Sequence, residues 1–262
     1  MAIEPKILLI GCGNMGRALL DGWLADSVVT PGQITVADPL AEVPDGVRQI
    51  AEIPNTPFEL TVLAIKPQQL DTVAPRLAAV SQTGVLLSIL AGVPTQRLAE
   101  IAPGARVARI MANLAAGFGM SPVALFAAPG LTEADRALLE RLGGANGRVE
   151  WLANEDLLHA VTALAGSGPG FVYRLLAALA AGGADLGLDP QAAAGMALTM
   201  VRGAAELADR SGEDFATLAS RVASPGGTTL AGLAALEQGG IDALIAATLR
   251  AARDRSVELS GG

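Results

Sequence analysis

A glycine-rich turn directly after an apolar run constrains this chain more than any other feature. The run Ile7-Leu8-Leu9-Ile10 leads into Gly11-Cys12-Gly13-Asn14-Met15-Gly16, which has the pattern G-x-G-x-x-G. Glycines let the backbone turn tightly, approach a phosphate without a Cβ in the way, and bring the next helix close to its strand. The N–H groups and the dipole of that helix then favour an anion at its N-terminus. The pattern predicts a pyrophosphate-binding turn, although such a turn can also be purely structural.

The residues after the turn favour the binding interpretation. Ala18, Leu19 and Trp23 continue with the spacing of an apolar helical face. A second apolar strand over 34–37 ends at Asp38, about twenty residues past the last glycine, where a ribose-binding acid is expected. A carboxylate there hydrogen-bonds the ribose of NADH and repels the extra phosphate of NADPH, so the charge favours NADH. Because Pro39 could turn the side chain away, the choice between NADPH and NADH stays open.

The composition predicts a folded protein that binds small molecules. Of 262 residues, 51% are apolar and 17% charged, which is enough for a substantial core. The net charge is −8 and the 18 basic residues are scattered, so a nucleic-acid or anionic-membrane surface is not expected. The most apolar run, 175–188, is shorter than the ~20 residues of a membrane helix. The chain also enters its first strand too early for a signal peptide, so a cytoplasmic location is expected.

The single cysteine and the single histidine narrow the chemistry further. Cys12 alone excludes an internal disulfide and a multi-cysteine metal site. It sits inside the phosphate turn, where a structural role is favoured over a nucleophilic one. His159 alone excludes a multi-histidine metal site, and its neighbours indicate an ordinary helical residue. No metal site is predicted.

The first part of the chain, residues 1–153, alternates strands and helices. Strands are predicted at 6–10, 34–37, 61–65, 85–89, 106–110, 123–127 and 148–152, with helices at 14–25, 69–80, 94–101 and 132–142. This order predicts an α/β fold, a Rossmann-like doubly wound parallel sheet of seven or eight strands. Four prolines between 38 and 60 predict that the usual crossover helix there is short or absent.

The second part, residues 154–262, reads as an all-helical domain. Helices are predicted at 168–182, 190–211 and 214–223, with a last helix from 241 to the end. Their alanine- and glycine-rich faces allow close packing against a second copy of the chain. A homodimer or a larger homo-oligomer is therefore expected.

Three further places could carry chemistry. Ser224-Pro225-Gly226-Gly227-Thr228-Thr229 is a polar glycine-rich loop that becomes a helix at the threonines, and its N–H and hydroxyl groups suit a carboxylate. An ordinary capped helix is the alternative. Lys66 follows a strand and could face a cofactor phosphate, the substrate or only solvent. Asn113 follows another strand and could orient a nicotinamide or only shape a turn.

With these residues in place, the chain resembles the pyrroline-5-carboxylate reductase family over nearly its whole length. The resemblance rests on the glycine-rich turn with Ile10, on Ala64-Ile65-Lys66-Pro67 and Ala91-Gly92-Val93, on Ala165-Gly166-Ser167-Gly168-Pro169, and above all on the segment 224–229. It implies a Rossmann domain, a helical domain that interlocks two subunits, and hydride transfer from NADH or NADPH to the C=N carbon of 1-pyrroline-5-carboxylate, which gives L-proline.

The resemblance also implies roles for individual residues. The cofactor would contact Gly11, Cys12, Gly13, Asn14, Met15, Gly16, Asp38, Ala64, Ile65, Lys66, Pro67, Ala91 and Asn113. Ser224, Gly226, Gly227, Thr228 and Thr229 would hold the substrate carboxylate, and Thr229 is the candidate for a hydrogen bond at the imine nitrogen.

One segment departs from the family pattern. Where the family reads Met-Pro-Asn-Thr-Pro, this chain has Met111-Ala112-Asn113-Leu114-Ala115, which keeps only the methionine and the asparagine. Two alternatives therefore stay open: a reductase of another cyclic imine or a keto acid, and a catalytically silent nucleotide-binding protein.

Overall fold

The computed structural model describes residues 5–260, which form two compact units. The first comprises residues up to Gly166 together with the end of the chain from Ala252, and the second comprises Ser167–Ala251. Helical residues 157–166 and the last turns of the final helix thus belong with the sheet. The change of sequence pattern at 154 marks the end of the last strand rather than this division.

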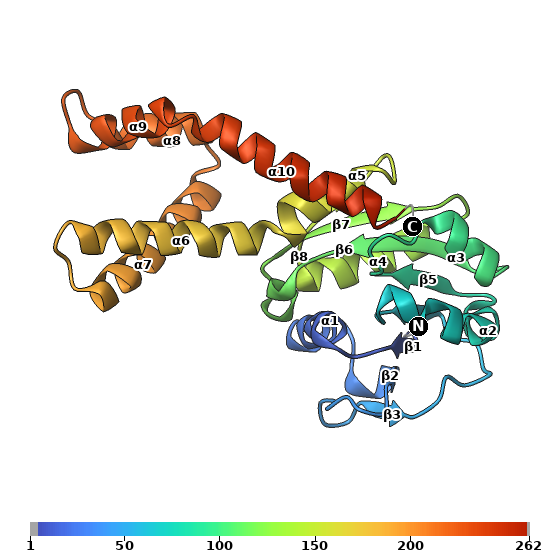
Figure 1. Cartoon of the computed structure of the whole chain (residues 1–262). Helices are drawn as coiled ribbons and strands as arrows, with labels where there is room; N and C mark the ends of the chain where they lie inside the picture. Colours follow the sequence, from blue (N-terminus) through green and yellow to red (C-terminus); the bar gives the residue numbers. More distant parts are fainter. Residues whose placement is uncertain (1–4, 261–262) are drawn as a thin grey trace. The chain divides into compact units, whose positions relative to one another are not determined.

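An eight-stranded sheet organises the first unit (Figure 1). Its order is β3-β2-β1-β4-β5-β6-β7-β8, with the crossover from β1 to β4 that is typical of doubly wound folds. The strands are β1 (Ile7–Ile10), β2 (Ile34–Ala37), β3 (Arg48–Ile50), β4 (Leu60–Leu63), β5 (Val85–Ser88), β6 (Arg106–Met111), β7 (Ser121–Ala127) and β8 (Gly147–Trp151). The predicted Rossmann-like fold is confirmed.

The sheet differs from the prediction in two places. The pairing of β7 with β6 is antiparallel, whereas all the other pairs are parallel. The short helical turn η3 (Leu114–Phe118) joins β6 to β7 and leaves no room for a crossover helix. The edge strand β3 was not predicted, because its three residues, Arg-Gln-Ile, are mostly exposed and polar. The predicted absence of a helix between 38 and 60 is confirmed.

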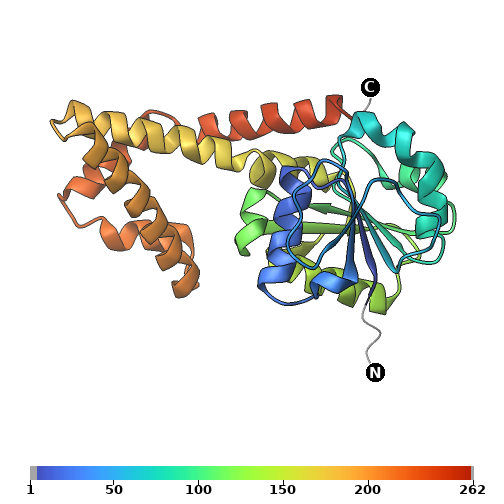
Figure 2. The same cartoon turned by 90° about the horizontal axis from the view of Figure 1, so that it is seen from below.

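Helices cover both faces of the sheet, which is why the central strands are apolar throughout. Ile7 and Leu9 of β1 face α1 (Asn14–Ala25) and α4 (Glu133–Asn146), in a core that contains the fully buried Trp23. Leu8 and Ile10 face the opposite core, with α2 (Leu70–Ser81) and α3 (Thr95–Ile101). Figure 2 shows the strands between blue α1 on one side and the cyan to green α2 and α3 on the other. The alternation of side chains along each strand thus fills two cores.

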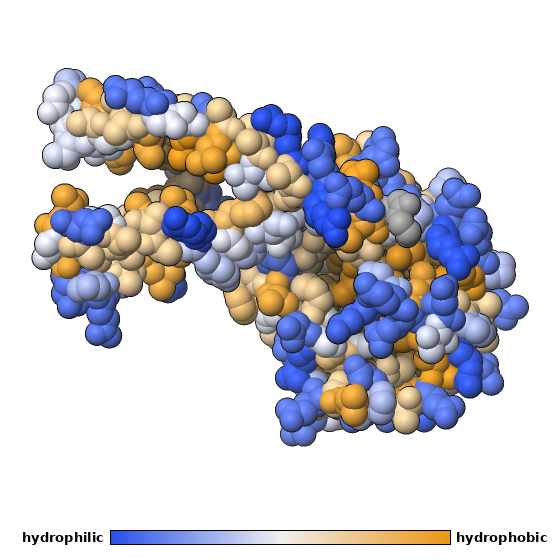
Figure 3. Space-filling model, viewed as in Figure 1, coloured by the Kyte–Doolittle hydropathy of each residue, from blue (hydrophilic) through white to orange (hydrophobic). Residues whose placement is uncertain are grey.

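The second unit contains helices that bury almost nothing by themselves. These are α6 (Gly168–Asp185), α7 (Pro190–Ser211), α8 (Phe215–Val222), α9 (Thr228–Gln238) and most of α10 (Ile241–Glu258). The helix starts follow the sequence, since Asp189 and Asp214 cap α7 and α8 through their side chains. Within the described chain, only Ala193 and Ala197 of α7 are buried among α6 to α9. Large apolar side chains lie on the surface of this unit instead (Figure 3).

An ion pair in the first unit provides a test of the fold. Both carboxylate oxygens of Asp135 accept hydrogen bonds from Arg106, at 2.6 and 2.8 Å. One of them also accepts from the N–H and hydroxyl of Thr132 at the start of α4. Burial raises the pKa of Asp135, but the bonds from Arg106 and Thr132 outweigh burial and hold this pKa below its ordinary value. The carboxylate therefore stabilises the fold in its ionised form.

We expect Asp135→Asn to lower the free energy of unfolding by about 2 kcal/mol at neutral pH, because Arg106 is partly exposed and its charge is partly solvated. The folded-state pKa is depressed, so the contribution is complete above the unfolded pKa of about 3.9 and is lost as the pH falls through the folded value. Urea unfolding at pH 7 and pH 3 measures both effects. Glu133→Gln, at an exposed position in the same helical turn, is the control. A loss for Asp135→Asn that is equally large at both pH values would contradict this account.

Candidate functional site

The turn between β1 and α1 has three glycines with three different surroundings. Gly11 has φ +85°, and a Cβ there would lie 2.6 Å from the carbonyl oxygen of Ala64. A Cβ on Gly16 would lie 2.6 Å from the carbonyl oxygen of Gly11. A Cβ on Gly13 would meet no atom within 4 Å. The first and third glycines are thus required by the fold, whereas the space beside the second is open.

The open side of Gly13 is the start of a helix. Gly13 is the N-cap residue of α1, and no side chain in the described part of the chain caps this end. The N–H groups of the first turn therefore have no side-chain acceptor in the described residues, and the positive end of the helix dipole lies behind them. This arrangement can bind a diphosphate, and it requires no basic side chain.

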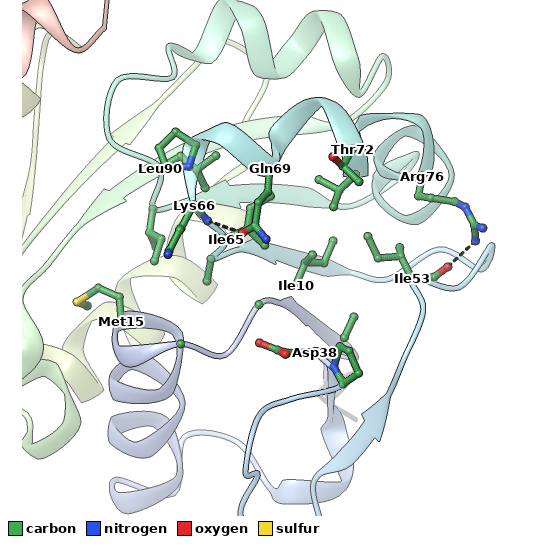
Figure 4. A pocket seen from close by; sticks show the side chains of 18 of the residues that line it. Ile10, Met15, Asp38, Ile53, Ile65, Lys66, Gln69, Thr72, Arg76 and Leu90 are labelled. Carbon is green, nitrogen blue, oxygen red and sulfur yellow. Dashed lines mark hydrogen bonds between the residues drawn. The ribbon is translucent and has the colours of Figure 1, made fainter.

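A cavity of about 900 Å³ lies at the carboxyl ends of the central strands, next to this turn. Figure 4 shows Asp38 and Met15 on one side of it and Lys66, Gln69 and Thr72 on the other. Ten of the residues predicted to contact a cofactor line this cavity: Gly11, Gly13, Asn14, Met15, Asp38, Ala64, Ile65, Lys66, Pro67 and Ala91. The sheet thus brings together residues from four separate segments of the sequence.

Asp38 lies at the end of β2 and does not turn away from the cavity. Its carboxylate accepts hydrogen bonds from the backbone N–H of Cys12, at 2.9 Å, and of Leu40, at 3.1 Å. These two bonds fix the side chain between the phosphate turn and the loop after β2. A negative charge is therefore held in the wall of the cavity, where Figure 4 shows the carboxylate facing the open space.

Lys66 forms part of the opposite wall. It follows β4 and precedes the turn η2 (Pro67–Gln69), where the backbone N–H of Lys66 donates to the side-chain oxygen of Gln69. The lysine is exposed and lines the cavity with its neighbours Ile65 and Pro67. An ammonium group at this edge can reach a phosphate or a carboxylate of a bound molecule.

Three predicted cofactor residues do not line the cavity. Gly16 packs inside the turn, and Cys12 is buried beside it. Burial raises the pKa of the Cys12 thiol to about 11, so this side chain is neutral and unreactive at neutral pH. The side chain of Asn113 accepts from the N–H of Ala115 and donates to the carbonyl of Ala165, at 3.0 Å. It ties η3 to residues 162–166, a role in turn geometry that the sequence left open.

The sequence missed the far end of the cavity. Ile53 follows the unpredicted strand β3, while Thr72 and Arg76 lie on α2. Arg76 donates to the carbonyl of Ile53, at 2.9 Å, and closes this end (Figure 4). Recognition of the third strand would have pointed to Ile53, because the loop after this strand begins at the same edge of the sheet.

The segment 224–229 lies in the second unit and forms a tight turn before α9. The N–H of Gly227 donates to the carbonyl of Ser224, at 2.9 Å, and Gly226 takes φ +72° within this turn. A Cβ on Gly227 would lie 2.4 Å from the hydroxyl of Ser224. Within residues 5–260, no side chain caps α9, which begins at Thr228 as predicted. The loop is thus built to leave a helix N-terminus open to an anion.

His159 has the structural role expected from the sequence. It lies in α5 (Leu157–Val161), and its Nδ1 atom shares a hydrogen bond of 2.9 Å with the hydroxyl of Ser256.

Two known protein families match separate parts of the chain. The family described as "NADP oxidoreductase coenzyme F420-dependent" matches residues 6–92. The family described as "Pyrroline-5-carboxylate reductase dimerisation" matches residues 155–259. The glycine-rich turn and the cavity thus fall largely in the first match, and the helices with exposed apolar faces fall in the second.

Individual relatives match the whole chain. A pyrroline-5-carboxylate reductase of Synechocystis is 36% identical over 96% of this chain and 97% of its own length. The solved structure of a pyrroline-5-carboxylate reductase from Coxiella burnetii has a TM-score of 0.90 at 28% identity and covers 98% of this chain and 99% of that one. The Plasmodium falciparum pyrroline carboxylate reductase with NADP bound has a TM-score of 0.87 at 21% identity, over 99% of this chain and 100% of that chain, and so shares the fold.

Proposed function

This chain belongs to the pyrroline-5-carboxylate reductase family, and from that premise we infer that it reduces 1-pyrroline-5-carboxylate to L-proline with NADH or NADPH. The observation that carries the inference is the 36% identity to a named reductase over 97% of that protein's length. The open glycine turn and the cavity beside it support the use of a nicotinamide dinucleotide.

We propose that residues of the first unit bind and orient the cofactor. The N–H groups at the start of α1 would hold the diphosphate beside Gly13, and Asp38 would accept from a ribose hydroxyl. The nicotinamide end would lie among Met15, Lys66 and Ala91. These residues follow β1, β4 and β5, whereas Asp38 at the ribose follows β2. Asn113 would support this end through its bond to Ala165. When bound, the cofactor supplies a hydride to the C=N carbon of the substrate.

The second unit would bind the substrate. We propose that the N–H groups at the start of α9, with the hydroxyls of Ser224 and Thr228, hold the carboxylate. Thr229 would hydrogen-bond at the imine nitrogen. An imine is electrophilic enough that positioning, charge complementarity and exclusion of water supply most of what its reduction requires.

The helical region after residue 153 would also be the region of subunit association, and the chain is expected to be a homo-oligomer. The stretch Leu157–Asp185 is 29 residues long, its most apolar window of 18 residues has mean hydropathy 1.2, and by length and composition alone it could cross a bilayer. Only 6% of its most apolar window is buried within one subunit. Because this stretch lies almost wholly inside the matched dimerisation region, we assign its apolar face to contact with a second copy. A cytoplasmic location remains a prediction.

A single assay tests the function against its alternatives. Loss of nicotinamide absorbance is followed with 1-pyrroline-5-carboxylate, then with other cyclic imines and with keto acids. Turnover of pyrroline-5-carboxylate to proline is expected, despite the altered segment Met111–Ala115. Turnover of other substrates only would assign a different reductase, and no turnover with any of them would favour a silent nucleotide-binding protein.

We further expect a preference for NADH over NADPH, because the fixed carboxylate of Asp38 would repel the additional phosphate. Asp38→Asn keeps an acceptor oxygen but removes the charge, and it should lower the KM for NADPH about tenfold, equal to about 1.4 kcal/mol. Steady-state kinetics with both cofactors measures the change. Asp45→Asn removes an exposed charge nearby and serves as the control. A wild-type preference for NADPH would contradict the orientation proposed for the ribose.

A further inference from the structure

The loop between β5 and α3 is one wall of the cofactor cavity. Ile89, Leu90 and Ala91 line the cavity, and Gly92, with φ +78°, turns the chain back towards α3. The loop follows the strand next to β4, so it faces the end of the cavity away from Asp38. On the proposed function, this is the wall against which the nicotinamide ring would lie.

One largely buried ion pair holds both ends of this loop. Arg109 on β6 and Glu155 after β8 are 2.8 Å apart, with side chains 10% and 21% exposed. The second amino group of Arg109 donates to the carbonyl of Leu90, at 3.1 Å. Glu155 accepts from the N–H of Thr95, at 2.7 Å, and from its hydroxyl, at 2.6 Å. Two side chains from distant parts of the sequence therefore fix the start and the end of one loop.

The electrostatics of the pair between Arg109 and Glu155 indicate a role beyond stabilising the fold. Removing two charges from water costs free energy that their attraction often only offsets, and apolar side chains commonly stabilise a core equally well. Here each charged group also makes a hydrogen bond to the loop backbone, which an apolar residue could not make. Burial raises the pKa of Glu155, but the bonds from Thr95 and Arg109 outweigh it and hold this pKa below its ordinary value, so the carboxylate stays ionised at neutral pH.

The end of the chain closes the space behind the loop. A Cβ on Gly92 would lie 2.8 Å from the carbonyl oxygen of Leu259, and the hydrogen bond between His159 and Ser256 lies beside this contact. The cavity left among Gly92, Arg109 and Ser256 measures about 10 Å³, barely the size of one water molecule. The residues behind the loop thus pack closely against its side away from the cofactor cavity.

We propose that Arg109 and Glu155 are positioning residues for hydride transfer, which hold the loop 89–94 as a fixed wall for the nicotinamide. The proposal rests on the proposed function, since it assumes a nicotinamide in this cavity. Misplacement of a reacting group by about 1 Å can cost about 10²-fold in rate, so a loosened wall should be visible in kcat as well as in cofactor affinity.

Arg109→Lys tests the proposal with little change in charge. A lysine can face Glu155 but lacks the planar fork that reaches both Glu155 and Leu90. We expect the Kd for NADH, measured by NADH fluorescence in the absence of substrate, to rise about tenfold, and kcat at saturating NADH to fall about tenfold. The KM for pyrroline-5-carboxylate should change less than about twofold. Arg97→Lys alters the exposed pair between Arg97 and Asp71 and should change none of these values.

The double variant Arg109→Met with Glu155→Gln removes both charges together and avoids an unpaired buried ion. It should melt near the wild-type temperature and still show the loss in NADH affinity and kcat. Wild-type NADH affinity and kcat in both variants would overturn the positioning role, as would loss of the folded state in both. Absence of NADH and NADPH binding by the wild-type protein would instead reject the proposed function, and the positioning role with it.

Discussion

Gly13→Val is expected to abolish most cofactor binding without unfolding the protein. Gly13 has φ −68° and ψ −168°, a conformation that valine adopts readily, and a Cβ there meets no protein atom within 4 Å. The added side chain would fill the space in which the diphosphate approaches the start of α1. We expect the KM for NADH to rise about 100-fold, equal to about 2.8 kcal/mol. The melting temperature should stay within about 2 °C of the wild-type value.

Variants of two other glycines are the controls for the effect of Gly13→Val. Gly32→Val also adds a side chain in open space at an exposed position and should leave both stability and cofactor binding unchanged. Gly16→Ala places a Cβ 2.6 Å from a carbonyl oxygen and should lower the melting temperature. A Gly13→Val enzyme with wild-type affinity for both cofactors would show that the diphosphate does not lie against this turn.

Thr228→Pro is expected to weaken substrate binding more than Thr228→Ala, because both variants remove the hydroxyl and only the proline also removes the backbone N–H group. Proline is well tolerated at the first position of a helix, and Gly227 before it has φ −81° and ψ 164°, which suit a residue that precedes proline. Loss of one N–H that donates to a carboxylate should cost about 2 kcal/mol. We therefore expect kcat/KM for pyrroline-5-carboxylate to be about 30-fold lower in Thr228→Pro than in Thr228→Ala. The Kd for NADH should not change.

Thr228→Ala is the matched comparison, because it removes the hydroxyl and keeps the N–H group. The additional loss in Thr228→Pro then measures the contribution of the N–H group alone. Steady-state kinetics on both variants, with circular dichroism to confirm that α9 is intact, separates the backbone from the side chain. Equal losses in the two variants would show that the N-terminus of α9 does not bind the carboxylate.

Most of the strands and helices could be predicted from the sequence, because their signals are local. The period of two in the strands, the period of 3.6 in the helices and the caps Thr132, Asp189 and Asp214 each lie within a few residues of the element they define. The strand β3 was missed for the same reason. Its three residues are mostly polar, and it forms only by pairing with β2 at the edge of the sheet.

The sequence predicted only those residues of the candidate site that belong to a recognisable motif. Four residues of the turn, Asp38 and Lys66 line one cavity as the motifs predicted, because residue type and position carry that signal. Ile53, Thr72 and Arg76 were not found, since they reach the cavity only through the arrangement of β3 and α2 around it. The structural role of Asn113 likewise became clear only when its partner Ala165, far along the chain, was known.

The sequence by itself determined the glycine-rich turn after β1, because glycine alone satisfies the positive φ of Gly11 and the close contact at Gly16. It also determined the starts of α7, α8 and α9 through short-range hydrogen bonding and turn geometry. Only the tertiary structure decided that Arg109 and Glu155, 46 positions apart along the chain, meet, and that their second hydrogen bonds end on Leu90 and Thr95. A charge that folding removes from water needs an oppositely charged partner, but the local sequence pattern does not show which residue that partner is.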